Sequence, residues 1–427
     1  MTDKKQLFPI KTNTACPWKW AFSGVNFQVG TTSSCTYTTK LEIPENNFDS
    51  FHNLPQKIED RQQMLKGLWP KNSCGYCRKI EEVGGVSERI SQLERQTDAN
   101  ITPPELISDN SAVEVTPTII EVWFRNTCNM SCVYCSPTFS SKWEDELKLH
   151  GTMDRFKGTE FTDHNNMSQY VQKKKLYDYQ KQQFWSYLKE NDRFKVLRQF
   201  WLLGGEPLMI PELDECLDFW DNHPNENLTF QLHTNLKTND YRFNKFLSRM
   251  EKLTKQKKVY QFKIVASLDG LGPQQEYVRY GLDTKQWIRN FEKLLKLDNV
   301  SVGINSTLSA LTLHEFPFLL EKIIEWNKGR KTINRIVHSF SIDIGYTTPY
   351  MFDINVFKNT IERCEDLFVV KNSTESAIKK RWEGFLLKFN KLIKDVDKIN
   401  GLKKYLSELD KRRNTDWKKT FPWLINL

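Results

Sequence analysis

The sequence predicts an α/β fold with a parallel sheet that is open or curled into part of a barrel. Two observations favour this class. Six runs rich in β-branched, aromatic and aliphatic residues have the length of buried strands. Amphipathic helical patterns separate most of these runs, as in ELDECLDFWDNH and KQWIRNFEKLLKL, and strands that alternate with helices favour a parallel sheet. The predicted strands lie at 118–124, 199–204, 228–234, 260–268, 300–308 and 336–345.

The regions around these strands differ from them in composition. A segment rich in Asn, Thr, Ser, Pro and aromatic residues precedes the first strand. A long insertion joins the first two strands, and its segments FSSKWEDEL and QQFWSYL make it a candidate lid. Charged helical patterns follow the last strand. We therefore predict a small Cys-rich domain at 1–98, a linker at 99–117, the sheet domain at 118–346 with an insertion at about 139–195, and a helical extension at 347–427.

Charge and hydropathy limit the expected partners of the chain. Its 427 residues carry a formal net charge of +9, but 62 basic residues stand against 53 acidic ones in mixed runs such as LEKIIEWNKGRK. Mixed charge is typical of solvated faces rather than of a nucleic-acid surface. No run approaches the roughly 18 apolar residues of a membrane span, and MTDKKQLFPIKTN has no apolar signal-peptide core. We expect a soluble cytoplasmic protein that binds neither membranes nor nucleic acid.

Nine cysteines in a reducing compartment are predicted to be metal ligands or buried thiols rather than disulfides. Cys216 and Cys364 lie alone in amphipathic helical patterns and are expected to be buried apolar side chains. Cys128, Cys132 and Cys135 follow the first predicted strand in NTCNMSCVYCSP, a spacing that lets three thiolates of one loop converge on one inorganic centre. Zinc and closed iron-sulfur clusters take four ligands, so one metal corner stays open for a small molecule.

CNMSCVYC, with the aromatic Tyr134 before its last cysteine, resembles the signature of the radical S-adenosylmethionine enzymes. The resemblance implies a partial (βα)6 barrel and a 4Fe-4S cluster on the three cysteines. It also implies that the amino and carboxylate groups of S-adenosylmethionine chelate the fourth iron. In this family one electron cleaves the cosubstrate to methionine and a 5′-deoxyadenosyl radical, which abstracts hydrogen from a substrate C–H bond.

Further motifs match the family pattern in the expected order along the chain. LLGGEPLM resembles the Gly-Gly-Glu-Pro motif of the family. By that likeness, Gly204 and Gly205 let the backbone approach the amino group of the ligand, and Glu206 accepts a hydrogen bond from that group. In HTNLKTN, Leu236 replaces the glycine that relatives often carry, and Asn235 is expected to line the pocket or to form a turn.

ASLDGLGPQQEYVRYG resembles the peptide-modifying branch of the family. This likeness implies that Ser267 contacts the ribose or the carboxylate of S-adenosylmethionine. It also implies that Arg279 pairs with the methionyl carboxylate, because a guanidinium fork can hold a carboxylate by two bonds. Asp269 is expected to cap a turn. At the fifth predicted strand, VGINSTLS places Asn305 at a strand end near the pocket.

Four cysteines near the amino terminus can close a second metal site. SCGYC supplies Cys74 and Cys77, while Cys16 and Cys35 complete four thiolates suited to zinc or to an iron-sulfur cluster. The order Cys-Pro-x-x-Trp, a later cysteine, then RQQMLKGLWPKNSCGYC is similar to the auxiliary-cluster modules called SPASM or twitch domains. Those modules normally follow the barrel, whereas this one precedes it. The resemblance implies one auxiliary 4Fe-4S cluster, with zinc as the alternative.

The resemblance also bears on the partners of the chain. Auxiliary-cluster relatives mostly modify peptides or proteins, which implies such a substrate and a reductase or flavodoxin-type electron donor. A small molecule, such as a nucleotide or sugar precursor, is the alternative substrate. A different class of function is a zinc-scaffolded module that binds nucleic acid. It would need basic and stacking aromatic residues on one face, whereas the aromatic residues here mostly follow core periodicity.

Overall fold

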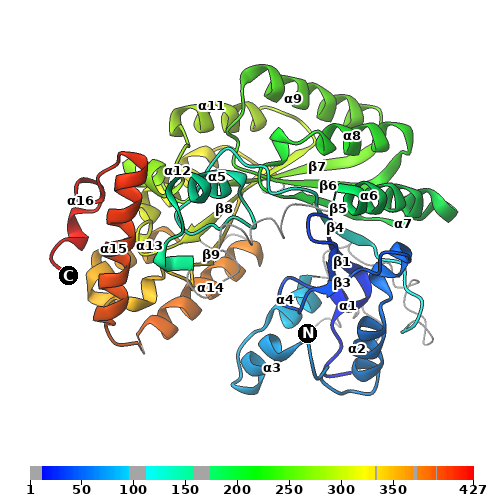
Figure 1. The fold of residues 1–427 in the computed structure, drawn as a ribbon, viewed down its shortest axis with the longest axis horizontal. Helices are drawn as coiled ribbons and strands as arrows, with labels where there is room; N and C mark the ends of the chain where they lie inside the picture. Colours follow the sequence, from blue (N-terminus) through cyan, green and yellow to red (C-terminus); the bar gives the residue numbers. More distant parts are fainter. Residues whose placement is uncertain (1–11, 96–111, 157–173, 332–333, 369–372, 391) are drawn as a thin grey trace.

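A nine-stranded sheet organises the computed structural model of the protein (Figure 1). The structure describes residues 12–95, 112–156, 174–331, 334–368, 373–390 and 392–427. The strands are β1 (Phe22–Asn26), β2 (Thr31–Ser33), β3 (Leu41–Glu42), β4 (Ile119–Trp123), β5 (Gln199–Leu203), β6 (Asn225–Thr234), β7 (Val259–Ser267), β8 (Val300–Leu308) and β9 (Val337–Ile342). Their order across the sheet is β3-β2-β1-β4-β5-β6-β7-β8-β9.

The strands β4 to β9 confirm the predicted α/β fold. Neighbours in this set are parallel and follow one another in sequence order. The register places Ile120 of β4 beside Phe200 of β5, and Ile264 of β7 beside Val302 of β8. All six carboxyl ends therefore lie at one edge of the sheet. The strand order is linear and β9 ends it, so the curling of this sheet into a partial barrel stays a prediction.

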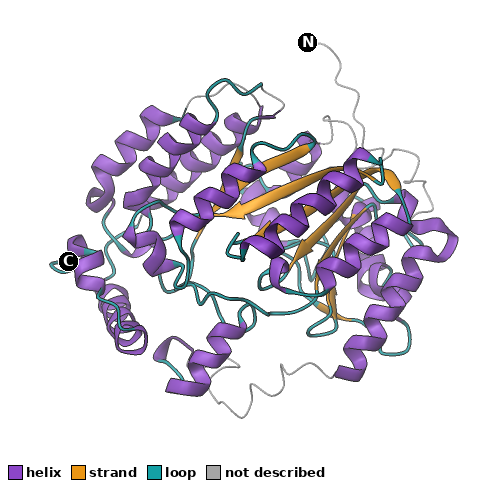
Figure 2. Ribbon diagram, turned by 90° about the horizontal axis from the view of Figure 1, so that it is seen from above, coloured by secondary structure: helices purple, strands orange, loops and turns teal. Residues whose placement is uncertain are grey.

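Helices connect the parallel strands and pack around the sheet (Figure 2). Side-chain caps fix where several of them begin: Asn239 accepts a hydrogen bond from the amide of Arg242, and Asp283 accepts one from the amide of Gln286. The α-helices are α1 (Pro17–Ala21), α2 (Pro55–Leu65), α3 (Gly75–Glu82), α4 (Glu88–Arg95), α5 (Ser141–His150), α6 (Lys174–Lys189), α7 (Arg193–Val196), α8 (Glu212–Asn222), α9 (Asp240–Lys255), α10 (Pro273–Val278), α11 (Thr284–Leu294), α12 (Phe316–Trp326), α13 (Lys358–Leu367), α14 (Ser373–Phe389), α15 (Val396–Arg413) and α16 (Trp417–Thr420).

The two faces of the sheet differ in burial. On β7, Phe262, Ile264 and Ala266 are fully buried in a core that they share with residues of the covering helices. The alternate residues Lys263 and Ser267 belong to the opposite face and are only half-buried. Parallel sheets usually bury both faces. The less covered face is therefore where a ligand can reach the carboxyl ends of the strands.

The amino-terminal region extends the same sheet. β1 pairs in parallel with β4, with Phe22 beside Ile119, and β2 and β3 follow in antiparallel order. The rings of Phe22 and Trp18 lie 5.6 and 6.2 Å from the ring of Trp201 on β5, measured between centroids. The amino-terminal segment thus joins the sheet through β1, and the domain boundary at residue 98 stays a prediction. The strands β2 and β3 have only three and two residues, which is too short for a periodic sequence pattern.

The insertion between β4 and β5 contributes buried helices. Trp143 and Leu147 of α5 are fully buried, and so is Phe184 of α6. Burial of such large apolar side chains anchors both helices in the core. The segments FSSKWEDEL and QQFWSYL are therefore anchored in the core in this structure, and their role as a lid stays a prediction. Residues 157–173 of the insertion, and most of the predicted linker 99–117, lie outside the described residues.

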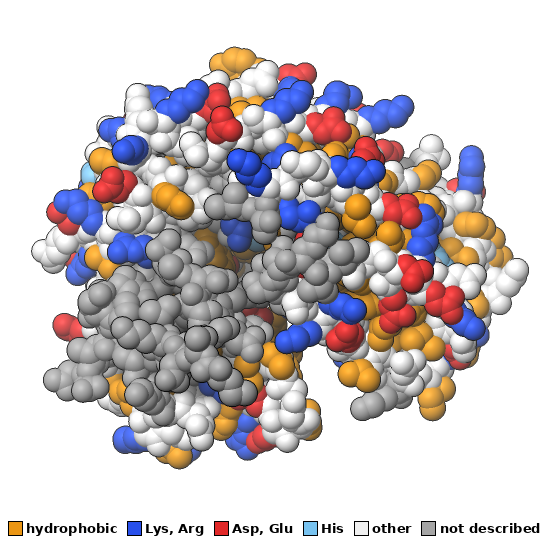
Figure 3. All heavy atoms as spheres, turned by 180° about the vertical axis from the view of Figure 1, so that it is seen from behind, with side chains coloured by type: hydrophobic (Ala, Val, Ile, Leu, Met, Phe, Trp, Pro, Cys, Tyr) orange, Lys and Arg blue, Asp and Glu red, His pale blue; other side chains and the backbone are white. Residues whose placement is uncertain are grey.

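The predicted helical extension is present as α13 to α16. α14 packs against β9, and α15 reaches the insertion, where Arg413 pairs with Glu146 of α5 at 3.0 Å. Cys216 of α8 and Cys364 of α13 are fully buried, which confirms the prediction that they are core side chains. Basic and acidic side chains are interspersed over the face shown in Figure 3. No described helix is long and apolar enough to cross a membrane.

Candidate functional site

The cysteine triplet occupies one loop at the carboxyl edge of the sheet, directly after β4. Cys128 and Cys132 are 9% exposed, and Cys135 is half-buried. Backbone bonds shape the loop: the Cys135 amide donates to the Cys132 carbonyl at 2.9 Å, and the Val133 amide donates to the Val278 carbonyl at 2.7 Å. The three thiols lie near enough to influence one another's ionisation. The structure thus brings the three predicted ligands together.

The first turn of α5 supports this loop from behind. The indole Nε1 of Trp143 donates to the Cys132 carbonyl at 2.8 Å. The Cys128 amide donates to the hydroxyl of Ser141 at 3.1 Å. This contribution of the insertion was missing from the sequence analysis. The two serines before WEDEL are a helix-start signal that places α5 directly after the triplet.

The carboxyl-terminal helix α15 also contacts the loop. The hydroxyl of Tyr405 donates to the Val133 carbonyl at 2.7 Å. Arg413 is buried, pairs with Glu146, and donates to the hydroxyl of Ser131 at 3.3 Å. Sequence reasoning gave the extension no part in the site, because a contact between such distant parts of the chain leaves no local pattern.

The glycines of the Gly-Gly-Glu-Pro motif lie against the cysteine loop. Gly204 has a φ of +151°, which L side chains rarely adopt, and a Cβ added to Gly205 would lie 2.3 Å from the Thr127 carbonyl oxygen. The Gly205 amide donates to the Arg125 carbonyl at 3.0 Å. From the sequence, the close approach at these glycines is expected to be to a ligand. In the structure, the backbone that carries the cysteines fills the space beside Gly205.

Glu206 joins the ends of β5 and β6. Its carboxyl group is fully buried and accepts hydrogen bonds from the Thr234 hydroxyl at 2.6 Å and the Asn235 amide at 2.6 Å. A third bond comes from the Leu208 amide at 3.0 Å. Burial raises the pKa of Glu206 to about 7, and these bonds oppose that shift. Both oxygens are thus bonded within the chain, and the expected bond to a ligand amino group stays a prediction.

Asn235 touches the triplet directly. Its side-chain Nδ2 lies 3.9 Å from the Cys128 sulfur and donates to Asn129 Oδ1 at 3.0 Å. The next residue, Leu236, is fully buried with a φ of 55°. That left-handed conformation costs a non-glycine residue about 1 to 2 kcal/mol. The chain therefore keeps the backbone shape that glycine favours at this position, although the residue is Leu.

Arg279 and Asp269 form a buried pair behind the triplet. Arg279 donates to both oxygens of Asp269, at 2.9 and 2.8 Å, and the side chains are 8% and 0% exposed. The Tyr134 hydroxyl donates to the same carboxylate at 2.6 Å, and the Thr307 amide donates to it at 2.8 Å. The guanidinium fork expected to hold the methionyl carboxylate therefore holds Asp269. Asp269 in turn links two strand ends and the loop instead of only capping a turn.

Ser267 and Asn305 lie side by side at the carboxyl edge. They are register partners on β7 and β8, and both are half-buried on the less covered face of the sheet. Asn305 Oδ1 accepts a hydrogen bond from the Ser339 hydroxyl of β9 at 3.0 Å. Ser267 ends β7, whereas Asn305 lies three residues before the end of β8, and the expectation that both line a pocket stays a prediction.

Burial dominates the electrostatics of the triplet. It raises the pKa of the Cys128 and Cys132 thiols, and it raises the pKa of Cys135 to about 12. The nearby cations of Arg279 and Arg413 lower the pKa of Cys132 and so oppose burial. Coordination to a metal ionises a thiol outright. Thiols that are otherwise neutral at pH 7 are therefore suited to a metal centre that supplies positive charge.

The four amino-terminal cysteines line one cavity. Cys16 precedes α1, Cys35 follows β2, and Cys74 and Cys77 lie at the start of α3. Burial raises the pKa of Cys16, and the neighbouring thiols of Cys35 and Cys74 raise it further. The structure therefore brings this second predicted set together as well.

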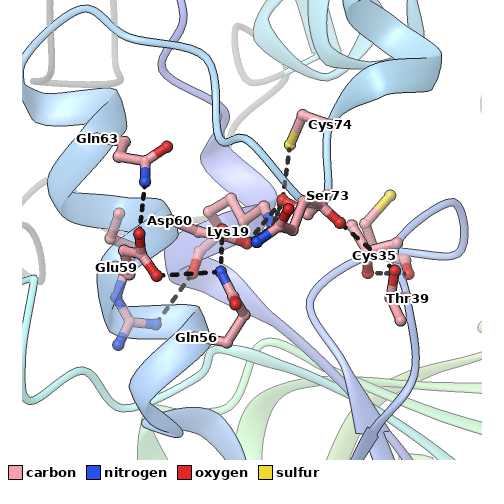
Figure 4. A network of polar contacts seen from close by, with 12 residues as sticks. Lys19, Cys35, Thr39, Gln56, Glu59, Asp60, Gln63, Ser73 and Cys74 are labelled. Atoms are coloured by element: carbon pink, nitrogen blue, oxygen red, sulfur yellow. Dashed lines mark hydrogen bonds and ion pairs between the residues drawn. The ribbon is translucent and has the colours of Figure 1, made fainter.

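A buried polar network holds the segments around this cavity (Figure 4). Lys19 of α1 donates to Asp60 of α2 at 2.5 Å and to Ser73 at 3.0 Å. The Ser73 hydroxyl donates to Asp60 at 2.7 Å and lies 3.6 Å from the Cys74 sulfur. The side chains of Lys19 and Asp60 are 2% and 3% exposed. This pair ties α1 and α2 to the residue that precedes Cys74.

Within the described residues, no group of three His, Cys, Asp or Glu side chains is arranged to hold a single metal ion. Thiolates bind zinc and iron-sulfur clusters alike, so the structure by itself assigns neither metal to the two cysteine sets.

Comparison with known proteins adds little to this description. No protein-family model and no curated protein matches the sequence. One similar solved structure bears the description "Structure of TYW1 with a lysine-pyruvate adduct bound". It is 15% identical to this chain, the match covers 61% of this chain and 75% of that chain, and the TM-score is 0.26. A similarity this low carries no argument about function, which has to come from the site itself.

Proposed function

We propose that the protein is a radical S-adenosylmethionine enzyme that carries a 4Fe-4S cluster on Cys128, Cys132 and Cys135. One observation carries the proposal. Three thiols of a single buried loop lie at the carboxyl edge of a parallel sheet, with the Asn235 amide group 3.9 Å from one of them. Such a set leaves one iron without a protein ligand. That open position suits the amino and carboxylate groups of S-adenosylmethionine.

When bound, the cluster supplies the electron that cleaves S-adenosylmethionine to a 5′-deoxyadenosyl radical, which abstracts hydrogen from the substrate. The chain contributes position and exclusion of water. Trp143 and Tyr405 hold the carbonyls of the cysteine loop from two helices. Both side chains are buried, and so are Cys128 and Cys132 of the loop, which limits the access of water. Fixed geometry matters because a primary radical attacks whichever C–H bond lies next to it.

The exposure of each side chain indicates which residues face the cosubstrate. We assign Ser267 and Asn305 to it, because these register partners are half-buried on the less covered face of the sheet, beside the end of β7. Glu206 and Arg279 already bond within the chain. These two residues position other groups of the site. Glu206 accepts a hydrogen bond from the backbone amide of Asn235, and Arg279 holds the carboxylate of Asp269 near the triplet.

The amino-terminal set is proposed to hold an auxiliary 4Fe-4S cluster in a SPASM- or twitch-like arrangement. The shared cavity of Cys16, Cys35, Cys74 and Cys77 supports this assignment. Four thiolates also suit zinc, which remains the alternative metal. A cluster here adds stability by joining segments that have a small core of their own.

A peptide or protein is the proposed substrate, and a small molecule such as a nucleotide or sugar precursor is the alternative. The link between auxiliary clusters and peptide modification supports the first choice. A reductase or flavodoxin-type protein is the proposed electron donor, and the cytoplasm is the proposed location, where thiols stay reduced.

Metal analysis separates this proposal from a zinc-scaffolded binding module. Anaerobically purified protein is expected to be brown, with a broad absorbance near ~400 nm and about eight iron atoms per chain for two 4Fe-4S clusters. Acid-labile sulfide should match the iron. Colourless protein with stoichiometric zinc at both sites would contradict the proposal.

A further inference from the structure

The guanidinium of Arg155 contacts the backbone of the cysteine loop. It lies in the short helical turn Asp154–Phe156. Its Nη1 donates to the carbonyl of Val133, the residue directly after Cys132, and also to the hydroxyl of Tyr405 at 2.6 Å. Tyr405 bonds the same carbonyl at 2.7 Å. The guanidinium is therefore held at the backbone between the second and third cysteines.

Aromatic rings surround this guanidinium. Its central carbon lies 5.7 Å from the ring centroid of Trp143, 5.0 Å from that of Phe156 and 5.3 Å from that of Tyr405. Arg155 is partly buried, and cation–π contact of this kind holds such a cation in place. Apolar rings screen charge far less than water does. The charge of Arg155 therefore acts on its surroundings more strongly than a surface charge would.

The other two arginines beside the triplet differ from Arg155. Arg279 is paired with Asp269, and Arg413 is paired with Glu146, so much of their field is cancelled. Among the residues that the structure describes, no carboxylate pairs with Arg155. Its guanidinium also lowers the pKa of Cys135, although burial raises that pKa more. Of the three cations, Arg155 has the least compensated charge.

We propose that Arg155 raises the reduction potential of the cluster held by the triplet. The inference rests on the proposed function, because it needs the cluster to be present. Reduction adds one electron and no proton to the centre, so its negative charge grows by one. A fixed cation stabilises that reduced state, and net charge is one of the factors that set iron-sulfur potentials. Helix α15 contributes to this effect, because the hydroxyl of its Tyr405 accepts a hydrogen bond from Arg155 and so helps to hold the cation in place.

The test is the midpoint potential of the cluster in full-length, reconstituted protein, followed by electron paramagnetic resonance. The relevant signal is the one that changes when S-adenosylmethionine is added, which separates it from an auxiliary cluster. In Arg155→Gln we expect the equilibrium constant for reduction to fall about tenfold, a shift of about 59 mV to more negative potential for a one-electron couple. Arg155→Lys, which keeps the charge, should shift the potential much less.

Arg412→Gln is the matched control. Arg412 lies on α15, bonds the Gly151 carbonyl at 3.0 Å and pairs with Glu408 at 2.6 Å. These partners lie outside the cysteine loop. Its removal should leave the potential near that of the wild type. An unchanged potential in Arg155→Gln with full iron content would overturn the inference while leaving the proposed function intact.

Arg155→His keeps the test decisive if the Gln variant fails to fold or to load iron. A histidine can lose its charge within one loaded sample as the pH rises. The potential at pH 8 should then be more negative than in the wild type. A wild-type potential at pH 8 would contradict the inference. A wild-type protein with no signal that responds to S-adenosylmethionine would refute the proposed function itself.

Discussion

The two cysteine sites are held by different means. The triplet lies in one loop, and the sheet edge, α5 and α15 all bond the backbone of that loop. The amino-terminal four come from three separate segments, joined through the network of Lys19, Asp60 and Ser73. The first site is held within one loop, whereas at the second a bound metal would add further links between separate segments. Loss of metal should therefore have unlike effects at the two sites.

The largest contrast is expected from removing each set of ligands. Replacing Cys128, Cys132 and Cys135 with Ala should remove about half of the iron and leave the fold intact, because the frame consists of backbone bonds. Replacing Cys74 and Cys77 should also remove about half of the iron, but it should open the amino-terminal region. Limited proteolysis with iron analysis measures both effects. Equal protease resistance of the two variants would break the comparison.

The next largest effect is expected at the buried pair beneath the triplet. Arg279→Ala leaves the carboxylate of Asp269 buried without its cation, which should lower the free energy of unfolding by about 3 to 5 kcal/mol. The double variant Arg279→Met with Asp269→Asn removes both charges and should recover much of that loss. Chemical denaturation measures the stability, and equilibrium binding measures the affinity for S-adenosylmethionine. Weaker binding without loss of stability would instead return Arg279 to the methionyl carboxylate.

A smaller effect is expected at Gly205. In Gly205→Ala the new methyl group would lie 2.3 Å from the Thr127 carbonyl oxygen, so the cysteine loop must shift. Overpacking of this kind costs about 1 to 3 kcal/mol, and iron loading should fall with it. Gly384→Ala in α14 is the matched control. Nothing lies within 4 Å of its added carbon, and Ala should stabilise the helix by about 0.5 to 1 kcal/mol. Equal stabilities of the two variants would contradict this reading.

The smallest effect is expected from the pH dependence of Glu206. Burial raises its pKa from the usual 4.5 to about 7, so the folded protein keeps a proton that the unfolded chain has lost. Between about pH 4.5 and 7 the folded state binds more protons, and the contribution of Glu206 to stability therefore declines as pH rises. Glu206→Gln should flatten that part of the profile of unfolding free energy against pH. An unchanged slope would mean that Glu206 is ionised throughout this range.

Features with a local pattern were predictable from the sequence. The six parallel strands and the buried positions of Cys216 and Cys364 follow from periodicity, and the triplet follows from its spacing. Features that depend on distant contacts were not predictable. Whether Arg279 pairs with a ligand or with Asp269 depends on how β7 and α10 position these two residues relative to each other. The bonds of Tyr405 to the cysteine loop leave no trace in the residues around either partner.

The central claim is tested most directly by 5′-deoxyadenosine formation. Reconstituted protein with dithionite and S-adenosylmethionine is compared with the variant in which Cys128, Cys132 and Cys135 are replaced by Ala. The account predicts 5′-deoxyadenosine from the wild type and none from the variant, even though the variant keeps its amino-terminal metal. Equal product from both proteins, or none from wild-type protein with verified iron loading, would contradict the account.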